Sequence, residues 1–128
     1  MFYGPKIGLV SFAIVLYMAT AFVRNMTWQD NVLLYEDVLA KGTNRARVHN
    51  NLGSAYAAAA NVEKALEHYQ SALQLKPDYA EAHTNLGLVL CGIGQVDRGR
   101  EELGIALQIE PDNKKARMFL SFYSRTAQ

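Results

Sequence analysis

The hydrophobic positions of this 128-residue chain follow two different patterns. Residues 7–23 form an unbroken run of seventeen uncharged and mostly apolar residues, with Lys6 before it and Arg24 after it. From residue 27 onward, apolar residues instead recur every three or four positions, which is the spacing of helices with one buried face. The sequence therefore predicts one helix that is apolar on all sides, followed by a series of two-faced helices.

The ends of the two-faced helices are marked by residues that cap or break helices. Asn61 stands where a cap is needed, and Pro77 and Pro111 each follow a helical pattern that they cannot continue. These signals predict helices over residues 45–58, 62–75, 79–92, 95–109 and 114–125. An earlier helix over residues 27–41 is predicted to begin at Thr27, whose hydroxyl would accept hydrogen bonds from the first free amides.

One 34-residue pattern is written twice, first over residues 46–79 and then over residues 80–113. Twelve of the 34 positions are identical in the two copies. A period of this length indicates a repeat architecture in which each helical hairpin stacks on the next. The identical positions include Ala46/Ala80, His49/His83, Leu52/Leu86, Gly53/Gly87, Ala72/Ala106 and Pro77/Pro111.

The spacing of small and large residues in this pattern resembles the tetratricopeptide repeat, and the resemblance covers just over half of the chain. It implies an all-α solenoid of helical hairpins with about two and a half repeats, preceded here by a long hydrophobic N-terminal helix. The expected organisation is a hydrophobic helix over residues 1–26, a linking helix in repeat register over 27–43, and a repeat domain over 44–128, with repeats 46–79 and 80–113 and a capping helix over 114–125.

Repeats of this kind commonly bind peptides in the groove lined by their first helices, so the resemblance implies a protein or peptide partner. Chaperone-binding members clamp a C-terminal carboxylate at fixed groove positions. Only Asn85 and Lys115 match that clamp, whereas Asn50, Ser54 and Phe119 stand at its other positions, so a carboxylate clamp is not expected. The asparagines serve equally well as links between neighbouring helices. The residues predicted to line the groove are Arg47, Asn50, Asn51, Ser54, Glu81, Thr84, Asn85, Leu88 and Lys115.

Three interpretations of the hydrophobic run at residues 7–23 stay open. Its length is close to the lower limit for crossing a hydrocarbon layer of about 30 Å, and Lys6 and Arg24 can reach outward to the lipid headgroups, which favours a transmembrane helix. A signal peptide has a similar pattern, with residues 19–21 as a small-residue cleavage site. A helix covered by other copies of the chain is the third interpretation. The residues predicted to face lipid or other copies are Ile7, Leu9, Phe12, Ile14, Leu16, Tyr17 and Phe22.

The segment that joins this run to the repeats carries a second resemblance. It is similar to the junction at which the last membrane helix of the transmembrane and tetratricopeptide repeat proteins, some of them protein O-mannosyltransferases, leads into their repeat domain. The matching residues are Arg24, Asn25, Trp28, Asp30, Asp37 and those of 45–53. The resemblance implies a repeat domain on the non-cytoplasmic face of a membrane. It carries no transferase activity, because the family's preceding helices and acidic catalytic loop have no counterpart in this sequence.

The last predicted helix is unusually apolar for the end of a solenoid. A terminal repeat normally has a polar outer face, yet this helix places several large apolar residues close together. Those that do not pack on the preceding repeat would be exposed in a monomer, which indicates an interface between copies. The residues predicted to form this end interface are Met118, Phe119, Phe122 and Tyr123.

Composition and residue chemistry argue against catalysis, metals and nucleic acid. The formal net charge is only +1, whereas a nucleic-acid partner usually needs a concentrated basic face. Cys91 is the only cysteine and is predicted to be a small buried residue. His49 and His83 lie one repeat apart at packing positions without further ligands, and His68 is placed on a solvated face, so no metal site or cofactor is expected.

Three hypotheses about function follow from these patterns. The first is a non-catalytic, membrane-anchored interaction module that crosses the membrane once, with its repeat domain on the non-cytoplasmic face. The second is a self-assembling structural protein that forms extracellular or cell-surface filaments through residues 7–23 and end-to-end stacking of its repeats. The third is an accessory or C-terminal fragment of a glycosyltransferase-type membrane protein. A homo-oligomer is expected from the apolar surface at both ends of the repeats.

Overall fold

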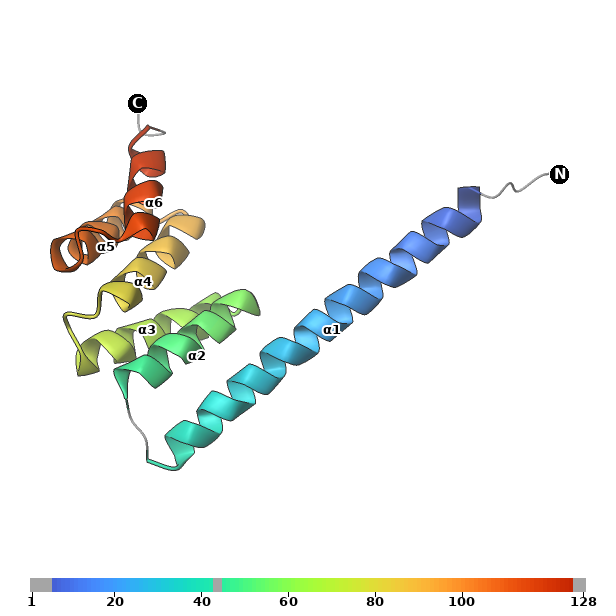
Figure 1. Ribbon diagram of the computed structural model, residues 1–128, viewed down its shortest axis with the longest axis horizontal. Helices are drawn as coiled ribbons and strands as arrows, with labels where there is room; N and C mark the ends of the chain where they lie inside the picture. The colour runs from blue at the N-terminus through green and yellow to red at the C-terminus, as the bar shows by residue number, and fades with distance from the viewer. Residues whose placement is uncertain (1–5, 43–44, 126–128) are drawn as a thin grey trace.

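The computed structural model describes the backbone of residues 6–42 and 45–125 and the side chains of residues 13–42 and 45–125. All regular structure in these residues is helical, as the sequence predicted (Figure 1). The helices are α1 (Lys6–Ala40), α2 (Ala46–Ala58), α3 (Val62–Leu75), α4 (Ala80–Gly92), α5 (Val96–Ile109) and α6 (Lys114–Arg125). The bounds of α2 to α6 agree with the predicted ranges to within one residue.

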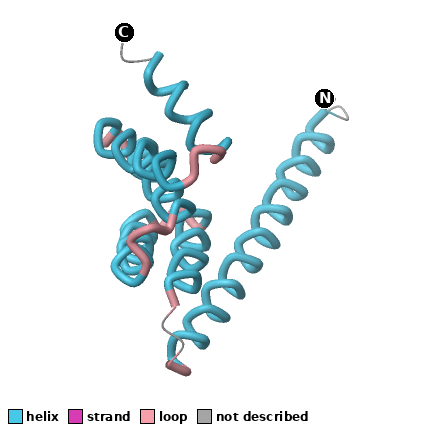
Figure 2. The backbone as a smooth tube through the Cα atoms, turned by 60° about the vertical axis from the view of Figure 1, so that its left-hand side comes forward, coloured by secondary structure: helices cyan, strands magenta, loops and turns pink. Residues whose placement is uncertain are grey.

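Helices α2 to α6 form a solenoid in which α2 pairs with α3, α4 pairs with α5, and α6 closes the stack. The first helix of each hairpin therefore lies beside the first helix of the next, and α1 packs against α2 at the opposite end from α6. Figure 2 shows the two hairpins stacked, with α1 running past them as a separate rod. The predicted helical solenoid is confirmed.

The core of the solenoid consists of two clusters that meet at α4. The first cluster joins the first hairpin to α4, and its buried members are Leu52, Tyr56, Ala65, Tyr69, Leu86 and Leu90. The second joins the second hairpin to α6 through Cys91, Leu103, Ala106 and Ala116. Cys91 is buried, as predicted, and burial raises the pKa of its thiol. Each repeat thus depends on its neighbour to complete its apolar core.

The two helices of each hairpin touch through small residues. A β-carbon added at Gly53 would lie 2.8 Å from the ring of Tyr69, and one added at Gly87 would lie 2.9 Å from the carbonyl oxygen of Gly99. A β-carbon at Gly99 would lie 2.7 Å from the carbonyl oxygen of Gly87. These distances leave no room for a side chain. The recurring small residues of the sequence pattern are therefore required by the close approach of the helices.

The turns inside the two hairpins share a left-handed residue at equivalent positions. Gly94 has a φ of 87°, and Ala60, which precedes it by one repeat length, has a φ of 59°. Glycine adopts this conformation without a steric penalty, whereas alanine does not. Asn61 then accepts a hydrogen bond from the Lys64 amide at 3.3 Å, which confirms its predicted role as the cap of α3. The first hairpin consequently has a strained turn where the second has a relaxed one.

Helix α1 is continuous across the predicted boundary at Thr27, so the expectation that a helix begins there is wrong. The Thr27 hydroxyl donates to the carbonyl oxygen of Val23 at 3.0 Å, one turn earlier in the same helix, and caps nothing. Residues 9–40 contain neither glycine nor proline, so no residue interrupts the hydrogen-bond ladder. Residues 6–40 therefore form one helix.

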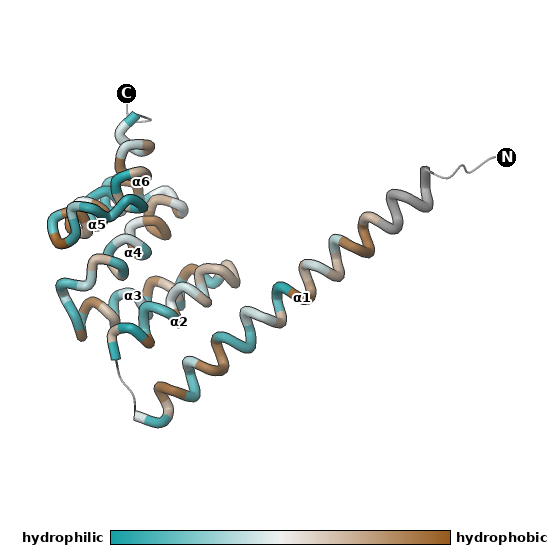
Figure 3. Tube along the Cα trace, in the orientation of Figure 1, coloured by the Kyte–Doolittle hydropathy of each residue, from teal (hydrophilic) through white to brown (hydrophobic). Residues whose placement is uncertain are grey.

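The two halves of α1 have different environments. The C-terminal half packs on the first hairpin through Val32, Tyr35 and Leu39. In the N-terminal half, every large apolar residue from Ile14 to Val23 is exposed, at 53–73% of its surface, and Figure 3 shows how far this half extends from the solenoid. These exposed residues are Ile14, Val15, Leu16, Tyr17, Met18, Phe22 and Val23.

The prediction that residues 7–23 cross a membrane is not supported by α1. Within residues 6–42 and 45–125, no helix is both long enough and apolar enough to cross a lipid bilayer, so the expected membrane-crossing helix is not found there. Of the residues predicted to face lipid or other copies, Ile14, Leu16, Tyr17 and Phe22 are exposed. Ile7, Leu9 and Phe12 lie outside the residues whose side chains are described.

Replacing Gly99 with alanine should lower the free energy of unfolding by about 1–3 kcal/mol, because the new methyl group would overlap the Gly87 carbonyl and the Cys91 side chain. Gly104 is the matched control, since a β-carbon there meets nothing within 4 Å and alanine favours the helix by about 0.5–1 kcal/mol. Urea unfolding followed by circular dichroism measures both variants. Equal stability of Gly99→Ala and Gly104→Ala would contradict the close approach.

Replacing Ala60 with glycine should raise the free energy of unfolding by about 0.5–1 kcal/mol, because glycine relieves the left-handed strain of the first turn. The reciprocal variant Gly94→Ala should lower it by a similar amount, since its new β-carbon has open space and only the backbone conformation is penalised. The same unfolding measurement applies. A destabilised Ala60→Gly variant would show that the turn is not strained.

Candidate functional site

The predicted groove residues lie along the row formed by α2, α4 and α6. Next to this row, a cleft of about 480 Å³ separates the start of α4 from the start of α6. Its lining combines carboxylates with lysines and amides, from Glu81, Thr84, Asn85, Glu110, Asp112, Asn113, Lys114 and Lys115. The mixed charge suits a polar ligand better than an apolar one.

A ladder of three side chains crosses the row of first helices. Lys115 of α6 donates to the side-chain oxygen of Asn85 at 3.1 Å, and the Asn85 amide donates to the side-chain oxygen of Asn50 at 3.0 Å. Asn50 is fully buried, and its amide nitrogen has no hydrogen bond of normal geometry, although the Tyr79 hydroxyl is close by. The asparagines therefore link neighbouring helices, while Asn85 and Lys115 also remain accessible from the groove.

Thr84 and Asn113 form a second link between α4 and α6. The Asn113 amide donates to the Thr84 hydroxyl at 3.1 Å, and the Thr84 hydroxyl donates to the carbonyl oxygen of Ala80 at 2.8 Å. The side-chain oxygen of Asn113 also accepts from the Ala116 amide at 3.0 Å, which caps α6. Thr84 is buried, so its role at this position is to hold the two helices together.

The remaining predicted groove residues divide into structural and exposed ones. Asn51 donates to the Tyr35 hydroxyl of α1 at 3.3 Å, and Ser54 accepts from the Tyr69 hydroxyl of α3 at 3.2 Å, so both tie α2 to its neighbours. Leu88 packs against the second core cluster. Arg47 and Glu81 are exposed. The accessible part of the predicted groove therefore consists of Arg47, Glu81, Asn85 and Lys115, with Asn51 and Ser54 partly covered.

The predicted end interface on α6 is split by the fold. Phe119 and Tyr123 pack against the second core cluster and are partly buried. Met118 and Phe122 are 59% and 58% exposed. Lys115, Met118 and Phe122 follow one another at helical spacing, so they share one face of α6. The accessible groove thus continues from a polar part at Lys115 into an apolar part at Phe122.

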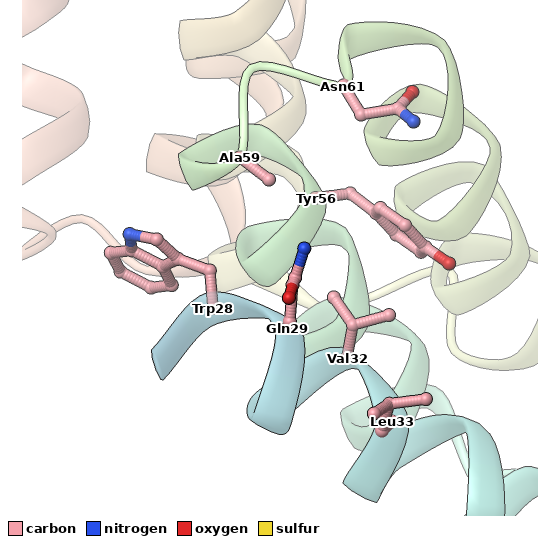
Figure 4. A pocket seen from close by; sticks show the side chains of 7 residues that line it. All are labelled: Trp28, Gln29, Val32, Leu33, Tyr56, Ala59 and Asn61. Carbon is pink, nitrogen blue, oxygen red and sulfur yellow. The ribbon is translucent and has the colours of Figure 1, made fainter. Parts of the chain in front are cut away.

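A pocket that the sequence did not reveal lies between α1 and the first hairpin. Its volume is about 350 Å³, and Figure 4 shows Trp28 at one end and Leu33 at the other, with Tyr56 across from α1. The complete lining is Trp28, Gln29, Val32, Leu33, Tyr56, Ala59 and Asn61. The only sequence signal for it was the apolar spacing of residues 27–41, which could not tell a covered face from an open one.

His49 and His83 each contact a residue on the second helix of their own hairpin, and they do not contact each other. His83 contacts Glu102 at 2.6 Å through Nδ1 and the Pro77 carbonyl oxygen at 2.9 Å through Nε2. At the equivalent place in the first repeat, Nδ1 of His49 lies 3.1 Å from Nδ1 of His68. The prediction that His68 lies on a solvated face is wrong, because His68 packs against α2. In both repeats the paired residues are 19 positions apart.

Packing around the His49–His68 pair keeps both rings in place. The ring of His68 stacks on that of Tyr56, with centroids 5.4 Å apart and an interplanar angle of 7°. The Tyr56 hydroxyl donates to the Glu36 carboxylate of α1 and accepts from Lys64 at 3.3 Å. Burial lowers the pKa of His49, and burial together with the neighbouring His49 lowers the pKa of His68. The neutral form of both rings is therefore favoured.

Comparison with known proteins matches one segment of the repeats to a family model. Residues 61–94 match the family model described as "TPR repeat". The chain is 30% identical over 69 residues to Protein O-mannosyl-transferase TMTC3 of Homo sapiens and 32% identical over 69 residues to the protein of the same name from Mus musculus. Each match covers 54% of this chain, which spans only 8% of the length of these relatives.

Solved structures share the fold at low sequence identity. MamA has a TM-score of 0.73 and 24% identity, over 78% of this chain and 58% of that one. The second TPR domain of human RPAP3, solved with an HSP70 peptide, has a TM-score of 0.71 and 21% identity, and the match covers 94% of this chain and 98% of that domain. The Sgt2 TPR domain of Aspergillus fumigatus has a TM-score of 0.74 and 20% identity, and the match covers 87% of this chain and 75% of that one. The helical hairpins, their small-residue contacts and the matched repeat together show that the chain has the tetratricopeptide repeat fold, with residues 61–94 matching the repeat itself.

Proposed function

We propose that the repeats bind an extended polypeptide segment along α2, α4 and α6. The observation that carries this proposal is the ladder from the buried Asn50 of α2 through Asn85 to Lys115, which places an accessible amide on α4 and an accessible ammonium group on α6. Side-chain amides both donate and accept hydrogen bonds, so they suit the backbone of an extended peptide. Two structural neighbours, the second TPR domain of human RPAP3 and the first TPR of Spaghetti, were solved with HSP70 and HSP90 peptides, which supports a peptide partner here.

The chemistry of the groove favours a particular kind of segment. An acidic group would pair with Lys115, and an apolar side chain would cover Met118 and Phe122 on the same face of α6. Two different parts of the ligand would then contact one helix. The proposal does not include the transferase activity in the name of the curated relatives, because the matched residues are only 8% of their length.

The double variant Asn85→Ala/Lys115→Ala should weaken peptide binding by about tenfold or more, the effect of losing roughly 1.4 kcal/mol. Peptides would be selected from a displayed random library against the unaltered chain, and affinities measured by fluorescence anisotropy. Glu101→Ala, an exposed change on the second helix of a hairpin, is the control and should leave binding unchanged. Selected peptides that bind the double variant as tightly as the control would refute the groove.

We also propose that the N-terminal half of α1 attaches the protein to a lipid bilayer. Its large apolar residues from Ile14 to Val23 are exposed on every side, which is unfavourable in water. The Thr20 hydroxyl donates to the Tyr17 carbonyl oxygen at 2.8 Å, so its polar group is satisfied within the helix, as an apolar environment requires. Trp28, just beyond this half, has the amphipathic side chain typical of the lipid headgroup level. The repeats then lie on the non-cytoplasmic side, as the junction resemblance implies.

The purified chain should float with phosphatidylcholine vesicles in a density gradient, whereas Leu16→Lys/Phe22→Lys should remain at the bottom because two charges in the apolar half are costly to bury in lipid. Leu75→Lys, the same change at an exposed position of α3, is the control and should still float. Flotation of all three proteins would contradict attachment through α1. Fibres that form without detergent and do not bind the vesicles would favour the alternative of a self-assembling structural protein.

A further inference from the structure

We propose that the exposed face of α6 binds the anionic headgroups of a phospholipid bilayer, as a second membrane contact in addition to α1. Its geometry rests on the proposed attachment through α1, whereas its chemistry comes from α6 alone. Since α6 closes the end of the solenoid opposite to α1, a contact there would fix the tilt of the repeats relative to the bilayer.

Helix α6 concentrates positive charge in a chain that is otherwise acidic. It holds four of the thirteen basic residues and none of the twelve acidic ones. All four basic side chains are exposed, and an exposed group of basic residues is attracted to a surface of anionic lipids. These four residues are Lys114, Lys115, Arg117 and Arg125.

Two large apolar side chains share the exposed face of α6 with this charge. Met118 and Phe122 are 59% and 58% exposed. Lys114 precedes Met118 by four positions and Arg125 follows it by seven, so these three side chains form one stripe of the helix. The opposite side of α6 packs on the second core cluster through Ala116. A helix with a basic and apolar outer face is typical of segments that lie in a lipid interface.

The direction of α6 agrees with such a contact. Figures 1 and 2 show that the N-terminal half of α1 and the C-terminal end of α6 point toward the same end of the molecule. The C-terminal end of α1 and the start of α2 lie at the opposite end in both views. A bilayer that holds the apolar half of α1 therefore faces the end of α6 that carries Phe122 and Arg125.

Nearby acidic and polar groups engage the start of α6 and not its outer end. Asp112, which precedes the helix, lies 4.0 Å from Arg117, and Glu110 is close to the same turn. Lys115 donates a hydrogen bond to α4. Arg125 lies more than two helical turns farther along, beside the exposed apolar pair. The positive charge nearest to the expected bilayer is therefore not offset by these carboxylates.

Two other occupants suit this face less well. A symmetric contact between the α6 helices of two copies would bring their positive charges together, which is unfavourable. A nucleic acid usually needs a larger basic surface than one helix of twelve residues. Met118 and Phe122 also border the peptide groove, so the experiments below change charges that lie outside this apolar pair.

The first experiment separates α6 from α1. Leu16→Gln/Phe22→Gln removes exposed apolar side chains from α1 without adding charge. We expect this variant to bind vesicles of phosphatidylglycerol mixed with phosphatidylcholine at low salt, but not vesicles of phosphatidylcholine alone. High salt should release it, because screening weakens attraction between exposed charges. Binding is measured by flotation at increasing lipid concentration.

Charge variants in this background test α6 itself. Adding Lys114→Gln/Arg125→Gln should weaken binding to the mixed vesicles by about tenfold or more, because each basic residue contributes to the attraction. Lys76→Gln/Arg98→Gln removes the same charge from exposed positions outside α6. This matched control should leave the affinity nearly unchanged.

A tryptophan on α6 reports the contact in the chain that keeps α1 intact. Trp28 is the only tryptophan, so Trp28→Phe/Phe122→Trp carries a single one on α6. Mixed vesicles with brominated acyl chains should quench its fluorescence. Trp28→Phe/Leu75→Trp places the tryptophan at an exposed position of α3 and should not be quenched.

Three results would overturn the proposal. The first is equal affinity of the α6 charge variant and its control for the mixed vesicles. The second is an unquenched tryptophan at position 122 in a chain that floats with those vesicles. The third is retention of a single-stranded oligonucleotide without binding to vesicles. Binding of α6 to anionic vesicles by a chain that does not float with phosphatidylcholine would refute attachment through α1 and support the contact through α6.

Discussion

The close approach of helix backbones inside each hairpin is the constraint on which the rest of the structure depends. At Gly87 and Gly99 the backbone of one helix takes the place where a side chain of the other would lie. This contact sets the distance between the paired helices and thereby brings Leu103 into the space between them. In the first hairpin, Gly53 makes the equivalent approach to Ala65, whose carbonyl oxygen would lie 3.2 Å from an added β-carbon. Because both hairpins use the same contact, they have the same shape and can stack.

The groove is a product of that stacking. When identical hairpins are placed one after another, their first helices form a continuous row, and residues from successive repeats come within hydrogen-bond distance. Asn50, Asn85 and Lys115 are far apart in the chain but are neighbours in this row. Asn85 and Lys115 therefore stabilise the stack while they remain accessible from the groove. A ligand that displaces the Lys115–Asn85 contact must replace the hydrogen bond it removes.

The sequence was most informative where a residue has one physical requirement. The recurrence of Gly53 and Gly87 and the prolines after α3 and α5 were enough to predict five helices to within one residue. Prediction failed at Thr27, because a capping side chain matters only where the helix ladder is already broken. The partner of His49 was also missed, because the comparison ran along the repeat while the contact crosses the hairpin to His68. Asn50 is buried because α4 packs over it, and the pattern of apolar residues in α2 alone cannot predict this contact.

The unbroken course of α1 has a mechanical consequence. Its 35 residues correspond to a rod of about 52 Å, whose C-terminal end is packed against α2. No hinge within the rod separates the exposed apolar half from the half that contacts the repeats. A surface that binds the apolar half of α1 therefore also fixes the distance of the groove from that surface and its rotation about the α1 axis. One residue inserted near Thr27 would turn the groove by about 100° around the rod, with no change to any residue that lines it.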